Sequence, residues 1–149
     1  MQRIQFYPST ELANILNEEA QSKGVSVSTY VSDLLEDYYG MKKNGISITR
    51  LTVAVLKEVE KYIATLPPNV PFDLNKASKT FREIDMTCGK KPQTIRASIG
   101  RAFSAKLGNG AFSNVRKYQD KNGKNILSVN NALMYEIYQW KNNKTNKEM

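Results

Sequence analysis

Residues 3–39 read RIQFYPSTELANILNEEAQSKGVSVSTYVSDLLEDYY, and this stretch decides which fold the sequence predicts. Its first six residues alternate, so that Ile4, Phe6 and Pro8 share one face of an extended strand. Two amphipathic helical patterns follow, over residues 9–24 and 26–40. The predicted order is therefore strand, helix, helix.

Capping residues mark the ends of both predicted helices. Ser9 is the expected N-cap of the first, and Ser26 or Ser28 that of the second. Gly24 is placed where a left-handed residue ends a helix, and Gly40 stops the second one. The apolar residues at helical spacing are Leu12, Ile15, Leu16 and Ala20, then Val27, Tyr30, Val31, Leu34, Leu35 and Tyr38.

A short strand at the start of so small a unit needs a partner. Its backbone N–H and C=O groups have no obvious mate, and about 40 residues rarely bury enough surface to fold alone. Pairing with the same strand of a second copy would give an antiparallel ribbon, with Ile4 and Phe6 facing the helices. Arg3, Gln5 and Tyr7 would then project outward, and a two-stranded ribbon fits the major groove of DNA.

On these residues the stretch resembles the ribbon-helix-helix family of Arc, MetJ and CopG type, without a gap over residues 3–39. The resemblance implies that Arg3, Gln5 and Tyr7 read bases, although Tyr7 departs from the polar or basic residue usual there. It also implies that the start of the second helix holds a DNA phosphate. The residues of that phosphate site are Ser26, Val27, Ser28 and Thr29.

Charge divides the chain into two parts. The whole sequence has 22 Lys and Arg against 14 Asp and Glu, a formal net charge of +8. The acidic groups exceed the basic ones in residues 1–45, whereas the positive charge lies in residues 46–149. We expect a ribbon-helix-helix domain at 1–40, a linker at 41–48, a basic domain at 49–141 and a disordered tail at 142–149. The acidic first unit could act mainly as a dimeriser.

The order of elements in the basic domain is typical of a winged helix. A long helix over residues 49–66 ends at two prolines, and its apolar stripe could pack on its own domain or on a second copy. A helix over residues 93–107 precedes two strands, 115–119 and 125–129, joined by an Asn-Gly turn. The predicted fold class is therefore α+β: a dimeric N-terminal ribbon-helix-helix followed by a winged-helix-like domain.

Basic and polar side chains of this domain are candidates for DNA contacts. Those assigned to the recognition helix are Lys90, Lys91, Gln93, Thr94, Arg96 and Arg101. Those assigned to the wing are Arg116, Lys117, Lys121 and Lys124. A structural alternative has the lysines simply solvated and Arg101 paired with Asp73 or Glu83. Residues 64–138 also resemble a small bacterial domain family of unassigned function, through Leu66-Pro67-Pro68, Gly100-Arg101 and Asn131 to Tyr135.

The composition excludes several classes of protein. Without histidine there is no Ser-His-Asp set and no imidazole metal ligand, and Cys88 is the single cysteine. We find no zinc motif, phosphate loop or paired carboxylates, so we expect no cofactor, no metal and no catalysis. No apolar run is long enough for a membrane span, which favours a cytoplasmic protein.

Three functions remain in order of preference. The first is a homodimeric, sequence-specific DNA-binding regulator, a repressor or a plasmid copy-number or partition protein, whose partner is double-stranded DNA. The second is an antitoxin-like module that binds a protein partner and autoregulates. The third is a histidine-free nuclease.

Overall fold

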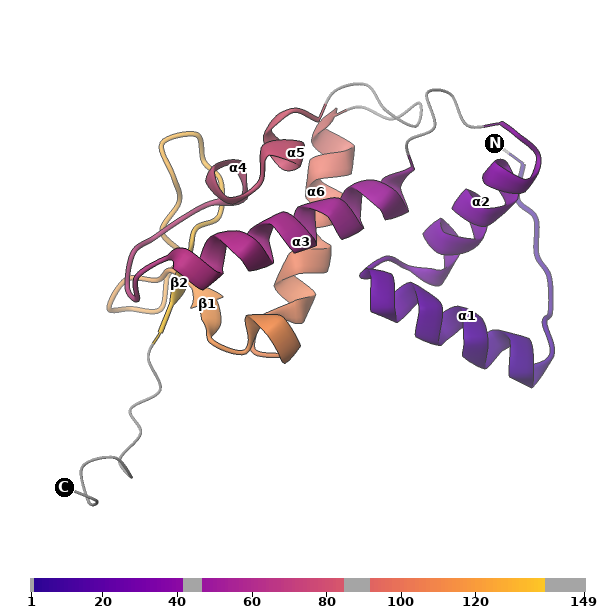
Figure 1. The fold of residues 1–149 in the computed structure, drawn as a ribbon, viewed down its shortest axis with the longest axis horizontal. Helices are drawn as coiled ribbons and strands as arrows, with labels where there is room; N and C mark the ends of the chain where they lie inside the picture. The colour runs from indigo at the N-terminus through magenta and orange to yellow at the C-terminus, as the bar shows by residue number, and fades with distance from the viewer. Residues whose placement is uncertain (1, 42–46, 85–91, 139–149) are drawn as a thin grey trace, which may run out of the picture.

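Helices dominate the part of the chain that the computed structural model describes, which is residues 2–41, 47–84 and 92–138. The elements are α1 (Thr10–Lys23), α2 (Val27–Tyr38), α3 (Ile48–Thr65), α4 (Leu74–Ala77), α5 (Lys79–Arg82), α6 (Pro92–Lys106), a 3-10 turn η2 (Gly110–Phe112), β1 (Val115–Lys117) and β2 (Tyr135–Ile137). Figure 1 shows α1 and α2 as a pair at one end of α3, with the other elements gathered around α3. None of the helices within these ranges has the length and apolar character that crossing a membrane requires.

The first two helices begin and end as the sequence predicts. Ser9 and Ser26 are their N-caps, and each hydroxyl accepts a hydrogen bond from a backbone N–H in the following turn. Gly24 ends α1 with φ of 72°, and Gly40 follows α2 with φ of 65°. Both lie in the left-handed region that glycine adopts without a steric penalty. These local signals were therefore sufficient to place both helices.

A carboxylate on α2 joins the first two helices to α3. Asp33 Oδ2 accepts a hydrogen bond from the backbone N–H of Thr49 at 3.0 Å, and another from the Thr49 hydroxyl. Thr49 lies in the first turn of α3, where N–H groups have no intrahelical acceptor and the helix dipole favours negative charge. Ser47 caps the same turn by accepting from Arg50 N–H at 3.1 Å. Asp33 is thus a second cap of α3, supplied by another helix.

The apolar face of α3 is the centre of the hydrophobic core. Val55 and Val59 are completely buried, so the stripe of this helix packs within its own domain. Aromatic rings close the core beneath α6, where Phe103 lies 4.8 Å from Tyr135 and 5.1 Å from Phe112 between ring centroids. Further core residues lie in or next to α4, α5, α6 and the strands: Phe72, Leu74, Phe81, Ile84, Ile95, Ile99, Val115 and Ile137.

The small sheet is built around β2. Strand β1 pairs with β2 in antiparallel register, with Val115 opposite Ile137. On the other side of β2, Phe72 and Tyr135 exchange two backbone hydrogen bonds of 2.9 and 2.8 Å. The sheet therefore ties the segment before α4 to the end of the described chain.

The predicted wing, a hairpin between strands 115–119 and 125–129, is wrong. Around the Asn-Gly turn, an isolated bridge joins Gln119 and Asn125, flanked by backbone hydrogen bonds from Asp120 N–H to the Lys124 carbonyl and from Ile126 N–H to the Tyr118 carbonyl, but no strand forms over 125–129. The chain then makes a second turn near residues 128–132 and returns to place β2 beside β1. The reason is burial, because all three residues of β2 are buried, whereas Val129 is fully exposed. Residues 118–134 form a long loop between the two strands.

The predicted α+β class with an N-terminal ribbon is also wrong for this chain. Residues 2–9 form no strand, and the two-stranded sheet lies near the other end of the sequence. Figure 1 shows these residues running along the outer side of α1 and α2, far from the sheet. Ile4 is 86% exposed and Phe6 54% exposed, so their alternation does not reflect burial within the chain. Alternation reports that two faces differ, but it does not supply a neighbouring strand.

Candidate nucleic-acid interface

The start of α2, which the resemblance assigns to phosphate binding, faces a cleft. Ser26 accepts a hydrogen bond from Thr29 N–H at 3.1 Å and donates one to the Thr29 hydroxyl at 3.0 Å. The N–H groups of Val27 and Ser28 lie in this first turn, which has no intrahelical acceptors. Such a turn favours an anion, because its N–H groups and the helix dipole both present positive charge.

The opposite wall of this cleft carries cations from α6. The cleft has a volume of about 900 Å³ and is lined by Ser26 and Thr29 on one side and by Arg101 and Lys106 on the other. Neither Asp nor Glu is among the described residues that line it. We call it the α2–α6 cleft. The described lining of the cleft is therefore positively charged, with no acidic side chain to balance it.

Gly24 sets how closely the turn between α1 and α2 approaches α3 and α6. A Cβ atom at this position would lie 3.0 Å from Lys106 Cε and 3.1 Å from Leu56 Cδ1. The φ of 72° favours glycine here, and an added Cβ would also require Leu56 and the flexible Lys106 side chain to move by a few tenths of an ångström. This close approach brings α2 and α6 to the two sides of one cleft.

Arg96 and Arg101 were predicted to act together, but the structure gives them different surroundings. The Arg96 guanidinium donates to the carbonyls of Ile84 at 2.8 Å, Arg82 at 3.2 Å and Phe81 at 3.4 Å. It therefore binds the end of α5 and holds α6 against it. Arg101 has no ion pair or hydrogen bond within the described part of the chain, and its guanidinium is exposed.

The alternative ion pair of Arg101 with Asp73 or Glu83 is not formed. The Asp73 carboxylate caps α4 by accepting from Lys76 N–H at 2.8 Å. Glu83 lies 4.0 Å from Lys79, its neighbour one turn earlier. Arg101 is consequently left with its charge available to a ligand.

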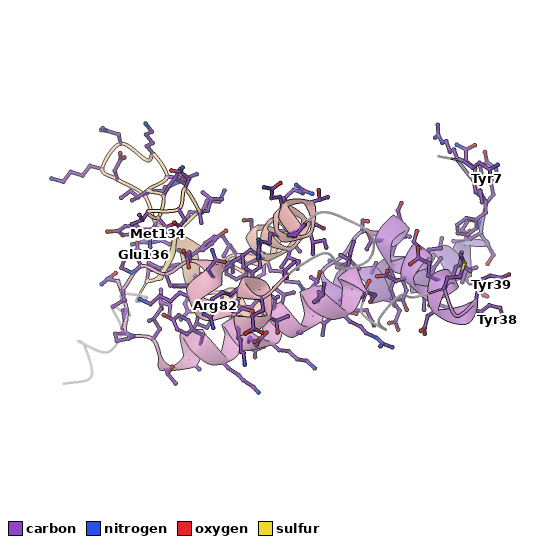
Figure 2. The ribbon with its side chains drawn as sticks, turned by 90° about the horizontal axis from the view of Figure 1, so that it is seen from above. Tyr7, Tyr38, Tyr39, Arg82, Met134 and Glu136 are labelled. Carbon is purple, nitrogen blue, oxygen red and sulfur yellow. The ribbon has the colours of Figure 1, made fainter. Side chains whose placement is uncertain are left out.

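The residues assigned to the wing are divided in the same way. Arg116 pairs with the buried carboxylate of Glu136 at 2.9 Å and lies over the ring of Tyr138, so it belongs to the sheet. Lys121 and Lys124 lie in the exposed turn of the 118–134 loop. Lys117 lines a second cleft, between α6 and this loop. Figure 2 shows the loop extending beyond Met134 and Glu136, with its side chains in the open.

The remaining predicted residues lie away from the α2–α6 cleft or outside the described residues, although Gln93 lines the second cleft. Arg3, Gln5 and Tyr7 are exposed, and Figure 2 shows Tyr7 at the end of the molecule farthest from the strands. Gln93 and Thr94 are exposed in the first turn of α6. Lys90, Lys91 and Cys88 lie outside the described residues. From the predicted set, the structure therefore brings together Ser26, Thr29 and Arg101 in the α2–α6 cleft. The second cleft brings together Gln93, Arg96, Arg101 and Lys117.

Lys106 was missed as a site residue, because the helical pattern placed it beside the apolar stripe of residues 93–107. A signal for the cleft wall was nevertheless present in the sequence. Ser98, Arg101 and Ala105 recur at helical spacing along α6 and line the cleft, and Asn109 lines it from the turn that follows. Such a face leaves room for a ligand beside its cations.

A second feature is an apolar surface on the first two helices. Ala20 is the buried residue of α1, and α2 has none, although both carry apolar stripes. Leu12, Leu34 and Leu35 remain between 43% and 53% exposed. Together with Phe6, Leu16 and Val31 they line an apolar groove of about 310 Å³. We call these six residues the apolar face.

Within the described ranges, no group of three or more Cys, Asp and Glu side chains is arranged to hold a metal ion. Comparison with models of known protein families, with curated proteins and with solved structures finds no match for this chain.

Proposed function

We propose that this protein is a homodimeric, sequence-specific DNA-binding regulator of transcription, of the repressor or plasmid copy-number and partition type, acting in the cytoplasm without a cofactor and without catalysing a reaction. The observation that carries the proposal is the α2–α6 cleft, where Arg101 and Lys106 face the first turn of α2 and none of the described residues along the walls is a carboxylate. A DNA phosphate matches this arrangement in charge. The resemblance of residues 3–39 to ribbon-helix-helix proteins independently favours a phosphate at the start of α2.

The exposed residues 2–9 carry sequence recognition in this proposal. Arg3 and Gln5 bear side chains that form paired hydrogen bonds with guanine and adenine in the major groove. Both are exposed, and Phe6 of the same segment lines the apolar groove. Phosphate contacts from the cleft would fix the register, and base contacts from this segment would specify the sequence.

The apolar face supports association of two copies. Leu12, Leu34 and Leu35 form a contiguous exposed apolar patch with Phe6, and such patches mark interaction surfaces in soluble proteins. Burying one leucine contributes about 1.5–3 kcal/mol, so a symmetric contact that covers several on each copy supplies a substantial association energy. Two copies would also present two cationic clefts to a two-fold symmetric operator.

The dimer is tested by light scattering on Leu35→Glu, which puts a charge into the apolar face. Leu127→Glu is a matched control, since Leu127 is 46% exposed, Leu35 is 53% exposed, and Leu127 lies in the 118–134 loop. We expect dimers for the wild type and for Leu127→Glu, and monomers for Leu35→Glu. A monomeric wild type over the whole concentration range would contradict the homodimer and favour a protein partner for the apolar face.

DNA binding is tested by selection from a random library, followed by anisotropy titrations on the selected site. Arg101→Ala/Lys106→Ala should weaken binding and reduce the slope of log K against log salt by roughly two, because two phosphate contacts are lost. The control Lys61→Ala/Lys76→Ala removes the same charge from exposed positions outside the cleft. Equal losses in the two double variants, or no selected sequence at all, would contradict the proposal.

A further inference from the structure

A second cleft, separate from the proposed phosphate site, lies on the other side of α6. It has a volume of about 770 Å³ and is enclosed by α4, α5, α6 and residues 130–135 of the chain. Its lining includes apolar side chains, among them Leu74, Phe81 and Leu133, and the cations Arg101 and Lys117. We call it the α6–loop cleft. It combines an apolar floor with a charged rim, as small-molecule sites do.

Gly100 keeps this cleft open. It lies in the middle of α6, where glycine is less favourable than alanine by about 0.5–1 kcal/mol. The backbone does not require glycine here, because φ is not positive, and an added Cβ would meet no atom within 4 Å. The missing side chain therefore leaves space that no described residue fills.

The charges of the cleft are not balanced from within. No Asp or Glu is among the described residues that line it. Lys117 is half-buried, and within the described part of the chain the side chains of Lys117 and Arg101 make no ion pair or hydrogen bond. Arg96, at the same wall, is occupied by three carbonyls. An anionic ligand would therefore meet two cations without a competing carboxylate in the described lining.

The floor offers one further polar atom. Tyr135 is 2% exposed, and within the described part of the chain its hydroxyl contacts Ser104 Oγ at 3.4 Å, which is long for an O–H···O bond. Burial raises the pKa of the Tyr135 hydroxyl, and its contact with Ser104 offsets this only in part, so the hydroxyl is a neutral donor at neutral pH. Buried tyrosine hydroxyls normally have a good partner.

Arg101 lines both clefts. We propose that the α6–loop cleft binds a small organic anion, a carboxylate or phosphate carried on an apolar ring or chain, and that this anion competes with DNA for the guanidinium of Arg101. Binding of the anion then lowers the affinity for DNA, and binding of DNA lowers the affinity for the anion by the same factor. The coupling rests on the proposed function, whereas the ligand site does not.

The ligand site is tested on the full-length protein by NMR titration with phenyl phosphate. Benzoate, inorganic phosphate and neutral benzyl alcohol are the comparison probes. We expect saturable shifts of backbone signals around Gly100 and Leu133 with phenyl phosphate and with benzoate. Inorganic phosphate and benzyl alcohol should each bind weaker by a factor of about ten or more. Inorganic phosphate lacks the apolar ring, and benzyl alcohol lacks the negative charge. Equal binding of benzyl alcohol, or shifts confined to α1 and α2, would overturn the assignment.

Two pairs of variants locate the probe. Gly100→Leu should abolish binding by filling the cleft, whereas Ala64→Leu places the same side chain on the exposed surface of α3. Lys117→Ala should weaken phenyl phosphate about tenfold, and Lys121→Ala, in the exposed turn, should leave it unchanged. Thermal unfolding of Gly100→Leu confirms that it is folded. Unaltered probe binding in Gly100→Leu would refute the site.

The competition is measured separately, by DNA titrations with and without phenyl phosphate. Saturating probe should weaken the affinity of the wild type for DNA several-fold. Gly100→Leu should bind DNA normally and lose the effect of the probe. If the probe binds but DNA affinity does not change, the competition is refuted. If the probe binds and no DNA is bound at all, the proposed function fails while the ligand site stands.

Discussion

Replacing Arg96 with alanine should destabilise the protein by about 2–3 kcal/mol, since hydrogen bonds to a charged group contribute about 1.5–3 kcal/mol each when short. The bond to the Ile84 carbonyl, at 2.8 Å, provides most of this value. The contacts with the carbonyls of Arg82 and Phe81, at 3.2 and 3.4 Å, add less. In a chain of 149 residues this loss lowers the melting temperature by roughly 5–10 °C.

Arg101→Ala is the matched control for this measurement. It makes the same substitution on the same helix, but at a guanidinium with no bond within the described part of the chain. We expect its free energy of unfolding to stay within about 0.5 kcal/mol of the wild type, as for surface substitutions in general. Urea unfolding followed by circular dichroism gives both values, and the slope should be unchanged.

The outcome separates a structural arginine from a ligand-binding one. Equal stability of Arg96→Ala and the wild type would show that the three carbonyl contacts contribute nothing, and the assignment of Arg96 to the fold would be wrong. Arg96→Lys should recover only part of the loss, because Nε and Nη2 of the guanidinium reach the three carbonyls from two separate nitrogens, whereas lysine offers one. If Arg96→Lys were as stable as the wild type, the proposed role of the guanidinium in joining α6 to α5 would also be contradicted.

Three further predictions concern stability. The carboxylate of Glu58 accepts hydrogen bonds from Ser78 and from Thr80, and although burial raises its pKa, these hydrogen bonds outweigh burial and lower it. The stability that Glu58 contributes is therefore present above about pH 4.5 and is lost as the pH falls through the lowered pKa. The stability of Glu58→Gln should accordingly change less with acid pH than that of the wild type, and identical curves would exclude this role. Gly24→Ala should cost at least about 1–2 kcal/mol in urea unfolding through its positive φ alone. Gly100→Ala should instead stabilise by about 0.5–1 kcal/mol, and a loss would show that the open space in the α6–loop cleft has been misjudged.

Helix ends could be predicted from the sequence because their determinants are local. Ser9, Gly24 and Ser26 act within one turn of the residues that they cap, so the spacing alone identifies them. The prolines after α3 ended that helix in the same way. Each of these signals involves residues fewer than five positions apart.

Strand pairing could not be predicted, because it is decided by segments far apart in the chain. The Asn-Gly turn correctly placed a reversal after Gln119, but β1 pairs with β2 and not with the segment directly after the turn. The alternation in residues 3–8 gave no information about a partner strand. Burial of Tyr135 and Ile137 is the deciding term, and it depends on the complete core.

The candidate site was predicted in part. Ser26, Thr29 and Arg101, which line the α2–α6 cleft, were among the residues predicted from the sequence to contact DNA. Nothing in the sequence distinguished Arg101 from Arg96. Their separation of five positions turns them to different sides of α6, and only the position of the α5 carbonyls decides which one is used by the fold. Lys106 was hidden by its place next to an apolar stripe.

The cap that Asp33 provides for α3 limits how freely the two parts of this molecule could be exchanged or separated. A fragment that begins at Ser47 keeps its own cap but loses the external carboxylate, so it should fray at its first turn. A pair of N-terminal helices from another protein, if grafted onto α3, would need an acidic side chain in the position of Asp33 to cap the first turn of α3. Shuffling by recombination is therefore expected to succeed only when the cut preserves both partners of this bond.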